Sequence, residues 1–137
     1  MIIVAATIDY ADQHARDEAV RQSAPVQMAT RDDEAGCFAY CFAADPSVPT
    51  RIQVYELWED EASLVAHFSH ANYDAMRVVL GAQGIVTAWN RMYEVGRNEP
   101  VYGSGGAIRT KFFVDDPDSA ASAPAMGSID PISTSRS

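Results

Sequence analysis

Residues 50–68, TRIQVYELWEDEASLVAHF, contain a change from strand-like to helix-like spacing of apolar side chains. Polar and apolar residues alternate up to residue 58, which is typical of a strand with one buried face. Asp60 is a favourable N-cap for a helix over about 61–69, because its carboxylate can accept hydrogen bonds from first-turn amides. The stretch therefore predicts a strand that leads directly into a helix. One face of this strand consists of Ile52, Val54, Glu56 and Trp58.

The residues on either side of this stretch predict the remaining elements. Runs of β-branched or alternating apolar residues indicate strands, and apolar residues three or four apart indicate helices. Pro25 lies within the first helix and is expected to kink or divide it. The resulting order, strand–helix–strand–strand–helix–helix–strand, predicts an α+β domain with a ferredoxin-like antiparallel sheet and its helices on one face. The further strands are predicted at about 2–8, 37–44 and 85–95, and the further helices at about 12–30 and 72–80.

The predicted strand 37–44 has one face of large side chains and one face of small side chains. The large side chains are Phe38, Tyr40 and Phe42, and the small ones are Cys37, Ala39, Cys41 and Ala43. We expect the small side chains to leave space for a ligand between the sheet and the helices. The large side chains would then face away from the helices, where an isolated sheet would expose an apolar patch. The strand therefore predicts a homodimer that covers this row.

The composition of the chain excludes several classes of partner. The 137 residues include 10 Lys and Arg against 19 Asp and Glu, and the formal net charge is −9. An acidic surface repels phosphate groups, so we expect no nucleic-acid partner and no membrane partner. No apolar run approaches the roughly 18 residues of a membrane span, and the N-terminus lacks a basic signal-peptide region. These features favour a cytoplasmic protein.

The two cysteines, Cys37 and Cys41, are predicted to be free thiols. On one strand their Cα atoms would lie about 13 Å apart, beyond the reach of a disulfide. They also lack the histidine and cysteine neighbours of a zinc site, so we expect no metal site there.

The character of the chain changes after Gly96. We assign residues 1–95 to one compact domain and residues 96–137 to a C-terminal extension. The extension includes a glycine-rich stretch at 101–107, and TKFFV at 110–114 could form one short strand. From Ser119 onward it holds Ser, Ala, Pro and Gly without aromatic residues, a composition that predicts a flexible tail.

Two short motifs and the order of the elements together resemble the antibiotic biosynthesis monooxygenase family. The motifs are EAGCFAY at 34–40 and ELWEDEASLVAH at 56–67, and the resemblance covers about residues 2–95. It implies a dimeric α+β barrel, in which two sheets pack face to face. Members of the family include cofactor-free oxygenases of polyketide quinols, quinol oxidases, heme-degrading enzymes and an isomerase. The resemblance therefore implies a fold more specifically than a reaction.

Some positions depart from the patterns of individual branches. Thr7 and Arg77 stand where the heme-degrading branch has an Asn and a heme-ligating His, which disfavours heme degradation. Ala43 and Val54 stand where the polyketide-oxidising branch has a His and an Asn, and only its Trp is kept, as Trp58. The reaction of that branch is therefore not implied in detail.

His67, Trp58 and Asn72 are the candidate catalytic residues. His67 borders the buried side of its helix and would act as a general base, or else is a structural histidine between sheet and helix. Trp58 would stack on a planar ring, or else belongs to the core. Asn72 stands where quinol-oxidising members often have a second His. It is predicted first as a helix cap and second as a stabiliser of charge, a role that Arg91 could also take.

A carboxylate on a buried strand face needs a partner, and for Glu56 we expect Arg91 or a helix N-terminus. The predicted substrate-binding residues are Glu56, Val54, Cys41, Ala43, Trp89 and Arg91. With the resemblance, they favour a cofactor-independent monooxygenase that oxidises a phenolic or quinol-type small aromatic molecule, with O2 as co-substrate. The alternatives are an isomerase or small-metabolite-degrading enzyme on the same fold, and a non-catalytic dimeric ligand-binding protein.

Overall fold

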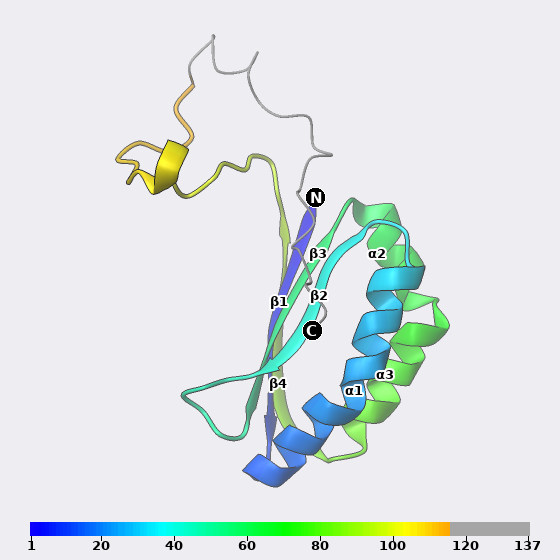
Figure 1. Ribbon diagram of the computed structural model, residues 1–137. Helices are drawn as coiled ribbons and strands as arrows, with labels where there is room; N and C mark the ends of the chain where they lie inside the picture. The colour runs from blue at the N-terminus through cyan, green and yellow to red at the C-terminus, as the bar shows by residue number, and fades with distance from the viewer. Residues whose placement is uncertain (116–137) are drawn as a thin grey trace. The chain divides into compact units, whose positions relative to one another are not determined.

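The computed structural model describes residues 1–115. Its domain has the predicted ferredoxin-like α+β architecture, with an antiparallel sheet covered on one face by helices (Figure 1). Each predicted element is present, with boundaries shifted by a few residues at most. The elements are β1 (Ile2–Tyr10), α1 (Gln13–Asp33), β2 (Cys37–Ala44), β3 (Arg51–Trp58), α2 (Glu61–Phe68), α3 (Ala71–Gly81) and β4 (Ile85–Glu94).

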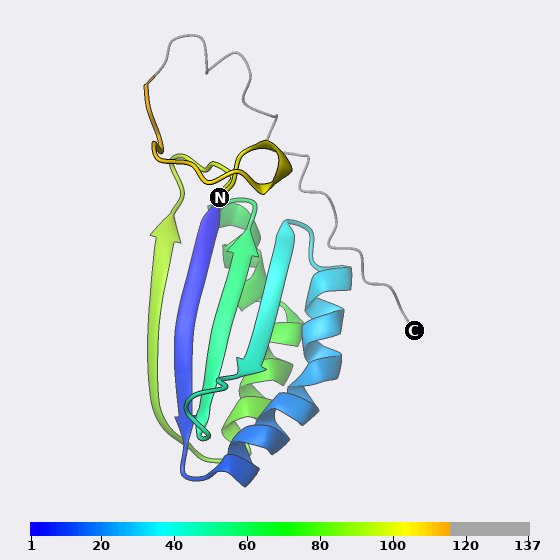
Figure 2. The same ribbon diagram turned by 60° about the vertical axis from the view of Figure 1, so that its left-hand side comes forward.

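The strands lie in the order β2-β3-β1-β4, and every neighbouring pair is antiparallel (Figure 2). The connection from β1 to β2 runs through α1, and that from β3 to β4 runs through α2 and α3. Both connections pass over the same face of the sheet, where α1 packs beside α3. The hydrophobic core lies between this face and the helices, and Ile52 and Trp58 are fully buried in it.

Helix α1 is a single helix from Gln13 to Asp33, so the prediction that Pro25 divides it is wrong. Asp12 is its N-cap and accepts a hydrogen bond from the backbone N–H of Ala15 at 2.8 Å. Proline removes one intrahelical hydrogen bond. The long contact of α1 with β2 and α3 compensates for this local loss, because tertiary packing supplies most of a helix's stability in a protein.

Strand β2 is turned the other way from the prediction. Tyr40 and Phe42 face the helices and are 2 % and 7 % exposed, whereas Cys41 lies on the other face. The register shifts between Cys37 and Ala39, so Phe38 is the additional residue of a bulge and is 44 % exposed. A period of two divides a strand into two faces but does not say which one meets the helices. The row of large side chains therefore gives no reason for a dimer.

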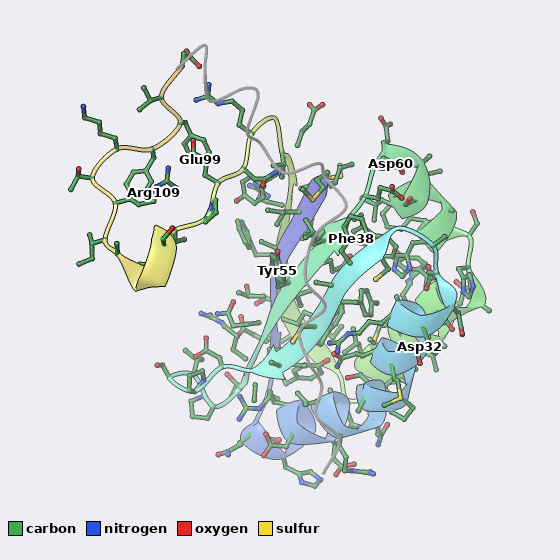
Figure 3. All side chains as sticks on the ribbon, turned by 45° about the horizontal axis from the view of Figure 1, so that its top comes forward. Asp32, Phe38, Tyr55, Asp60, Glu99 and Arg109 are labelled. Carbon is green, nitrogen blue, oxygen red and sulfur yellow. The ribbon has the colours of Figure 1, made fainter. Side chains whose placement is uncertain are left out.

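The face of the sheet opposite the helices is open and carries several large side chains. Tyr55, Trp89 and Tyr93 lie there and are 46 %, 45 % and 49 % exposed. Figure 3 shows Tyr55 on this side of the sheet. All residues of β4 are exposed, because the helices do not cover this edge strand.

Gly36 connects α1 to β2 and allows α2 to approach closely. Its φ of +81° is in the left-handed region that favours glycine. A Cβ atom at this position would lie 2.2 Å from the Oγ atom of Ser63 in the first turn of α2. The Gly36 carbonyl also accepts a hydrogen bond from the Glu59 N–H at 2.8 Å. This turn therefore fixes α2 against the end of α1.

We expect Gly36→Ala to lower the free energy of unfolding by at least about 2 kcal/mol, because it combines an unfavourable φ with overpacking. Urea unfolding of the full chain measures this change. Gly81→Ala is the matched control, because nothing lies within 4 Å of a Cβ there and the helix conformation suits alanine. Equal stabilities of the two variants would contradict the proposed role of Gly36.

The chain divides into two units, the first from Met1 to Gly96 and the second beginning at Arg97. Within the second unit Tyr102 and Ile108 form an isolated bridge, and Arg109 pairs with Glu99 (Figure 3). Residues 110–114 do not form a strand, so that prediction is wrong. The predicted flexible tail from Ser119 onward lies outside the described residues. Within residues 1–115, no helix combines the length and apolar character needed to cross a membrane.

Candidate functional site

A cavity of about 200 Å³ lies between the sheet and the helices α2 and α3. An apolar cavity of about 150 Å³ can hold a benzene ring, so this space suits a substituted one-ring or compact two-ring molecule. Its polar lining residues are Glu56, His67 and Arg77. The apolar and aromatic walls are formed by Val4, Tyr40, Phe42, Leu64, Phe68, Tyr73, Met76 and Leu80.

His67 is held in one orientation at the wall of this cavity. Only 2 % of its surface is exposed, and it projects from α2 toward the sheet. The imidazole ring lies 4.6 Å from the Trp58 ring between centroids, and the rings of Tyr73 and Tyr40 approach it edge-on at 5.3 and 5.4 Å. These contacts leave the imidazole little rotational freedom.

Glu34 connects the three helices through its carboxylate. It is the C-cap residue of α1, and its side chain is 5 % exposed. Oε1 lies 2.7 Å from Nδ1 of His67 on α2, and Oε2 accepts a hydrogen bond from Nδ2 of Asn72 on α3 at 3.1 Å. The Nδ1 atom of His70 lies 3.9 Å from the same Oε2. The carboxylate therefore has two close partners, as a buried charge requires.

Glu56 is a second buried carboxyl group and lines the cavity itself. Burial raises its pKa to about 7; the Trp58 indole N–H, which donates to Oε2 at 2.9 Å, opposes this rise, and the negative charge of Glu34 adds to it. At neutral pH, Glu56 can therefore act as a hydrogen-bond donor or as a proton acceptor.

The Cys37 thiol and the Tyr40 phenol remain protonated at neutral pH. Burial, with the charges of Glu34 and Glu56, raises the pKa of Cys37 to about 12 and also raises the pKa of Tyr40. Cys37 and Cys41 are free thiols, as predicted. Because the thiolate is the reactive form of cysteine, Cys37 is not suited to be a nucleophile.

Four of the predicted substrate-binding residues lie on the open face of the sheet, opposite the cavity. Strand pairing places Trp89 beside Thr7, and Arg91 beside Ala5. Through Gln53 and Tyr55 of β3, the same face of the sheet continues to Ala43 and Cys41 on β2. Glu56 lies on the other face. The prediction that these four residues line a cavity with His67 is wrong. For Cys41 and Ala43 the reason is that the small side chains of β2 face away from the helices, and Trp89 and Arg91 lie on the same open face.

The remaining predicted residues lie on the helix side of the sheet. Val54 is buried in the core but does not line the cavity. Trp58 is fully buried beneath His67 and does not line the cavity. It therefore belongs to the core, which was the predicted alternative to stacking on a ligand ring. Asn72 is not the cap of α3; His70 is the N-cap, and its Nδ1 accepts from the Asn72 N–H at 3.0 Å. The partner of Glu56 is the Trp58 indole rather than Arg91.

Sequence reasoning missed several residues of this site, among them Glu34, Tyr40, Tyr73 and Arg77. Glu34 has a recognisable signal, because it is an acidic residue directly before the glycine turn that ends α1. The helical spacing of Tyr73, Met76 and Leu80 indicates a buried stripe but not a cavity. Within residues 1–115, no group of three or more His, Cys, Asp or Glu side chains is arranged to hold a metal ion.

The family model described as antibiotic biosynthesis monooxygenase matches residues 1–78, more than half of the chain. The chain belongs to this family. The matched region contains Glu34, Glu56 and His67, so these candidate residues lie within the family domain of the antibiotic biosynthesis monooxygenases. The resemblance found in the sequence is therefore confirmed.

Solved structures with the fold of the antibiotic biosynthesis monooxygenases agree with this assignment. A candidate member from Deinococcus radiodurans is 24 % identical, with a TM-score of 0.62, and the match covers 75 % of this chain and all of that one. A candidate member from Caulobacter crescentus CB15 is 14 % identical, with a TM-score of 0.62 and coverage of 70 % and 91 %. These likenesses show a shared fold. No curated protein sequence matches the chain.

Proposed function

We propose that this protein is a cofactor-independent monooxygenase that oxidises a phenolic or quinol-type small aromatic molecule with O2. The observation that carries the proposal is the cavity, in which His67 and Glu56 lie among apolar and aromatic walls. A neutral phenol reacts slowly with O2, because O2 is a triplet and the phenol is a closed-shell molecule. Removing the phenolic proton makes the ring electron-rich enough to transfer an electron to O2. A base in a dry cavity is therefore the main requirement of the reaction.

In the proposed reaction His67 accepts the phenolic proton and the resulting phenolate transfers one electron to O2. Recombination of the two radicals forms a carbon–oxygen bond and gives a peroxide. Cleavage of its O–O bond leaves a quinone carbonyl and releases the second oxygen atom as water. Glu56 is placed to supply a proton to this departing oxygen, because its pKa is about 7. This oxygen also takes up the proton held by His67, and the ring hydrogen leaves as a proton that replaces the one given by Glu56. The sum is one phenol and one O2 converted to one quinone and one water.

Oxygen uptake by metal-free protein with methylhydroquinone and 1-naphthol tests this proposal. We expect uptake that depends on protein and substrate, and incorporation of one oxygen atom from labelled O2 into the naphthoquinone product. A chelator should leave the rate unchanged. Absence of oxygen uptake with every phenol and quinol tested would contradict the proposal.

The presence of both a carboxyl group and an imidazole in the cavity also favours a second function. His67 and Glu56 could move a proton between two carbon atoms of a small metabolite, as an isomerase does, with no requirement for oxygen. Turnover under strict anaerobiosis distinguishes this function from the first.

We also propose that the protein is a homodimer that pairs through the open face of its sheet. The support is the group of exposed apolar side chains on that face, which includes Tyr55, Trp89 and Tyr93, together with the uncovered strand β4. Apolar side chains that gather on an exposed face often mark a protein–protein contact. A second copy of the same face would cover it with an isologous contact.

Sedimentation of the full chain at micromolar concentration is expected to show a dimer. Trp89→Glu should shift the protein toward the monomer, because it removes an apolar ring from the contact and a carboxylate there would have to lose its hydration on pairing. Val78→Glu is the control, because Val78 is 71 % exposed on α3. A monomeric wild-type protein would contradict this part of the proposal.

A further inference from the structure

We propose that Glu34 is a positioning residue for His67, which fixes the proton on Nδ1 and thereby leaves Nε2 as the base that faces the cavity. The inference deepens the proposed function and, for its kinetic part, rests on it. It starts from the three-helix contact of Glu34 with His67 and Asn72.

The hydrogen-bond partners of Glu34 determine the tautomer of His67. The Asn72 amide donates to Oε2, so that oxygen is an acceptor. Oε1 lies 2.7 Å from Nδ1 of His67, and a carboxylate oxygen can only accept there. Nδ1 must therefore carry the proton that it donates, and the other ring nitrogen of the neutral imidazole is unprotonated.

The Nε2 atom is the part of His67 that can reach a ligand. It has no hydrogen-bond partner within residues 1–115. Every fully buried side-chain nitrogen or oxygen atom in this part of the chain does have a partner. Nε2 is therefore not fully buried, although only 2 % of the surface of His67 is exposed. Since His67 lines the cavity, this unprotonated nitrogen is available to a phenol bound there.

Glu34 also compensates the charge that the reaction creates. When a phenolic O–H bond breaks, its proton forms a bond with Nε2, and the imidazole becomes a cation while the substrate becomes a phenolate. An isolated cation among apolar and aromatic rings would be costly. The carboxylate at 2.7 Å provides the opposite charge directly beside it. Asn72 holds the second oxygen of Glu34 and so keeps the first one aligned.

The spectroscopic test is a long-range proton–nitrogen spectrum of the histidine rings in uniformly labelled full-length protein. We expect wild-type His67 to be protonated at Nδ1 and unprotonated at Nε2. Glu34→Gln should change this tautomer, because Asn72 donates to the glutamine oxygen and the glutamine NH2 group then faces Nδ1. The control Glu61→Gln replaces an exposed acidic residue at the start of α2 and should leave the spectrum unchanged. A wild-type His67 protonated at Nε2 would overturn the inference, and this outcome requires neither a variant nor activity.

The kinetic test is a double-mutant cycle in the oxidation of 1-naphthol. Glu34→Gln should lower kcat at least about tenfold, as expected when a catalytic imidazole loses the residue that sets its tautomer. In the His67→Ala background the same substitution should have almost no further effect, because Glu34 acts through His67. An equal loss in both backgrounds would show a structural role and overturn the inference. If no variant oxidises any phenol, the proposed function fails, while the tautomer still decides the role of Glu34.

Discussion

Replacement of His67 by glutamine is expected to lower the rate of phenol oxidation by about 10²- to 10⁴-fold, the usual contribution of a general base. Glutamine is close to histidine in size and can keep a hydrogen bond to Glu34, so the core beside Trp58 and Tyr73 should remain filled. It cannot accept a proton at neutral pH. The loss should therefore appear in kcat, with a smaller change in KM.

The matched control for this substitution is His14→Gln, because His14 is an exposed histidine on α1. It should retain the wild-type rate. Steady-state oxygen uptake with 1-naphthol measures both variants, and urea unfolding checks that His67→Gln is folded. Activity of the folded His67→Gln protein within about twofold of wild type, far less than a general base contributes, would exclude His67 as the base.

The second large effect concerns the stability of the fold as a function of pH. The pKa of Glu56 is about 7 in the folded protein and near the ordinary 4.5 in the unfolded chain. The folded protein therefore binds this proton more tightly. The contribution of Glu56 to stability is fully present below pH 4.5 and is lost as the pH rises through 7. A shift of this size corresponds to about 3 kcal/mol.

Glu56→Gln should remove this dependence, because glutamine does not ionise but can still accept the hydrogen bond from the Trp58 indole. We expect the free energy of unfolding of the wild-type protein to fall from pH 5 to pH 8 relative to that of Glu56→Gln, by an amount approaching about 3 kcal/mol. Urea unfolding at both pH values measures it. Glu61→Gln, at an exposed acidic position, should retain the wild-type dependence. The same change in the free energy of unfolding with pH in Glu56→Gln and in wild type would contradict a raised pKa of Glu56 in the folded protein.

Local sequence patterns predicted the elements of this domain well, because each pattern is set by neighbours in the chain. The switch at Asp60 from an alternating to a helical spacing marks the end of β3 and the start of α2. The consequence of Pro25 was not predictable in the same way. Whether a helix continues through proline depends on what packs against it, and the contact of α1 with β2 and α3 is formed by distant residues.

The position of His67 beside a cavity follows from its place next to the buried side of α2, which the sequence reveals. The orientation of β2 cannot be predicted from the sequence, because both of its faces carry apolar side chains and the bulge at Phe38 has no clear local signal. That one ambiguity moved Cys41 and Ala43 to the wrong side of the sheet. The contact of Glu34 with His67 joins residues 33 positions apart and arises only when α1 and α2 pack together.

The most direct test of the proposed chemistry is the absorption spectrum of 1-naphthol bound to the protein without oxygen, at a pH below the pKa of free 1-naphthol. Anaerobiosis stops the reaction before electron transfer, so the spectrum reports only the state of the phenolic proton. We expect the long-wavelength absorption of the naphtholate with wild-type protein, and the spectrum of neutral naphthol with the His67→Gln variant. Bound naphthol that remains neutral in the wild-type protein, or no binding at all, would contradict a cavity in which His67 removes the phenolic proton.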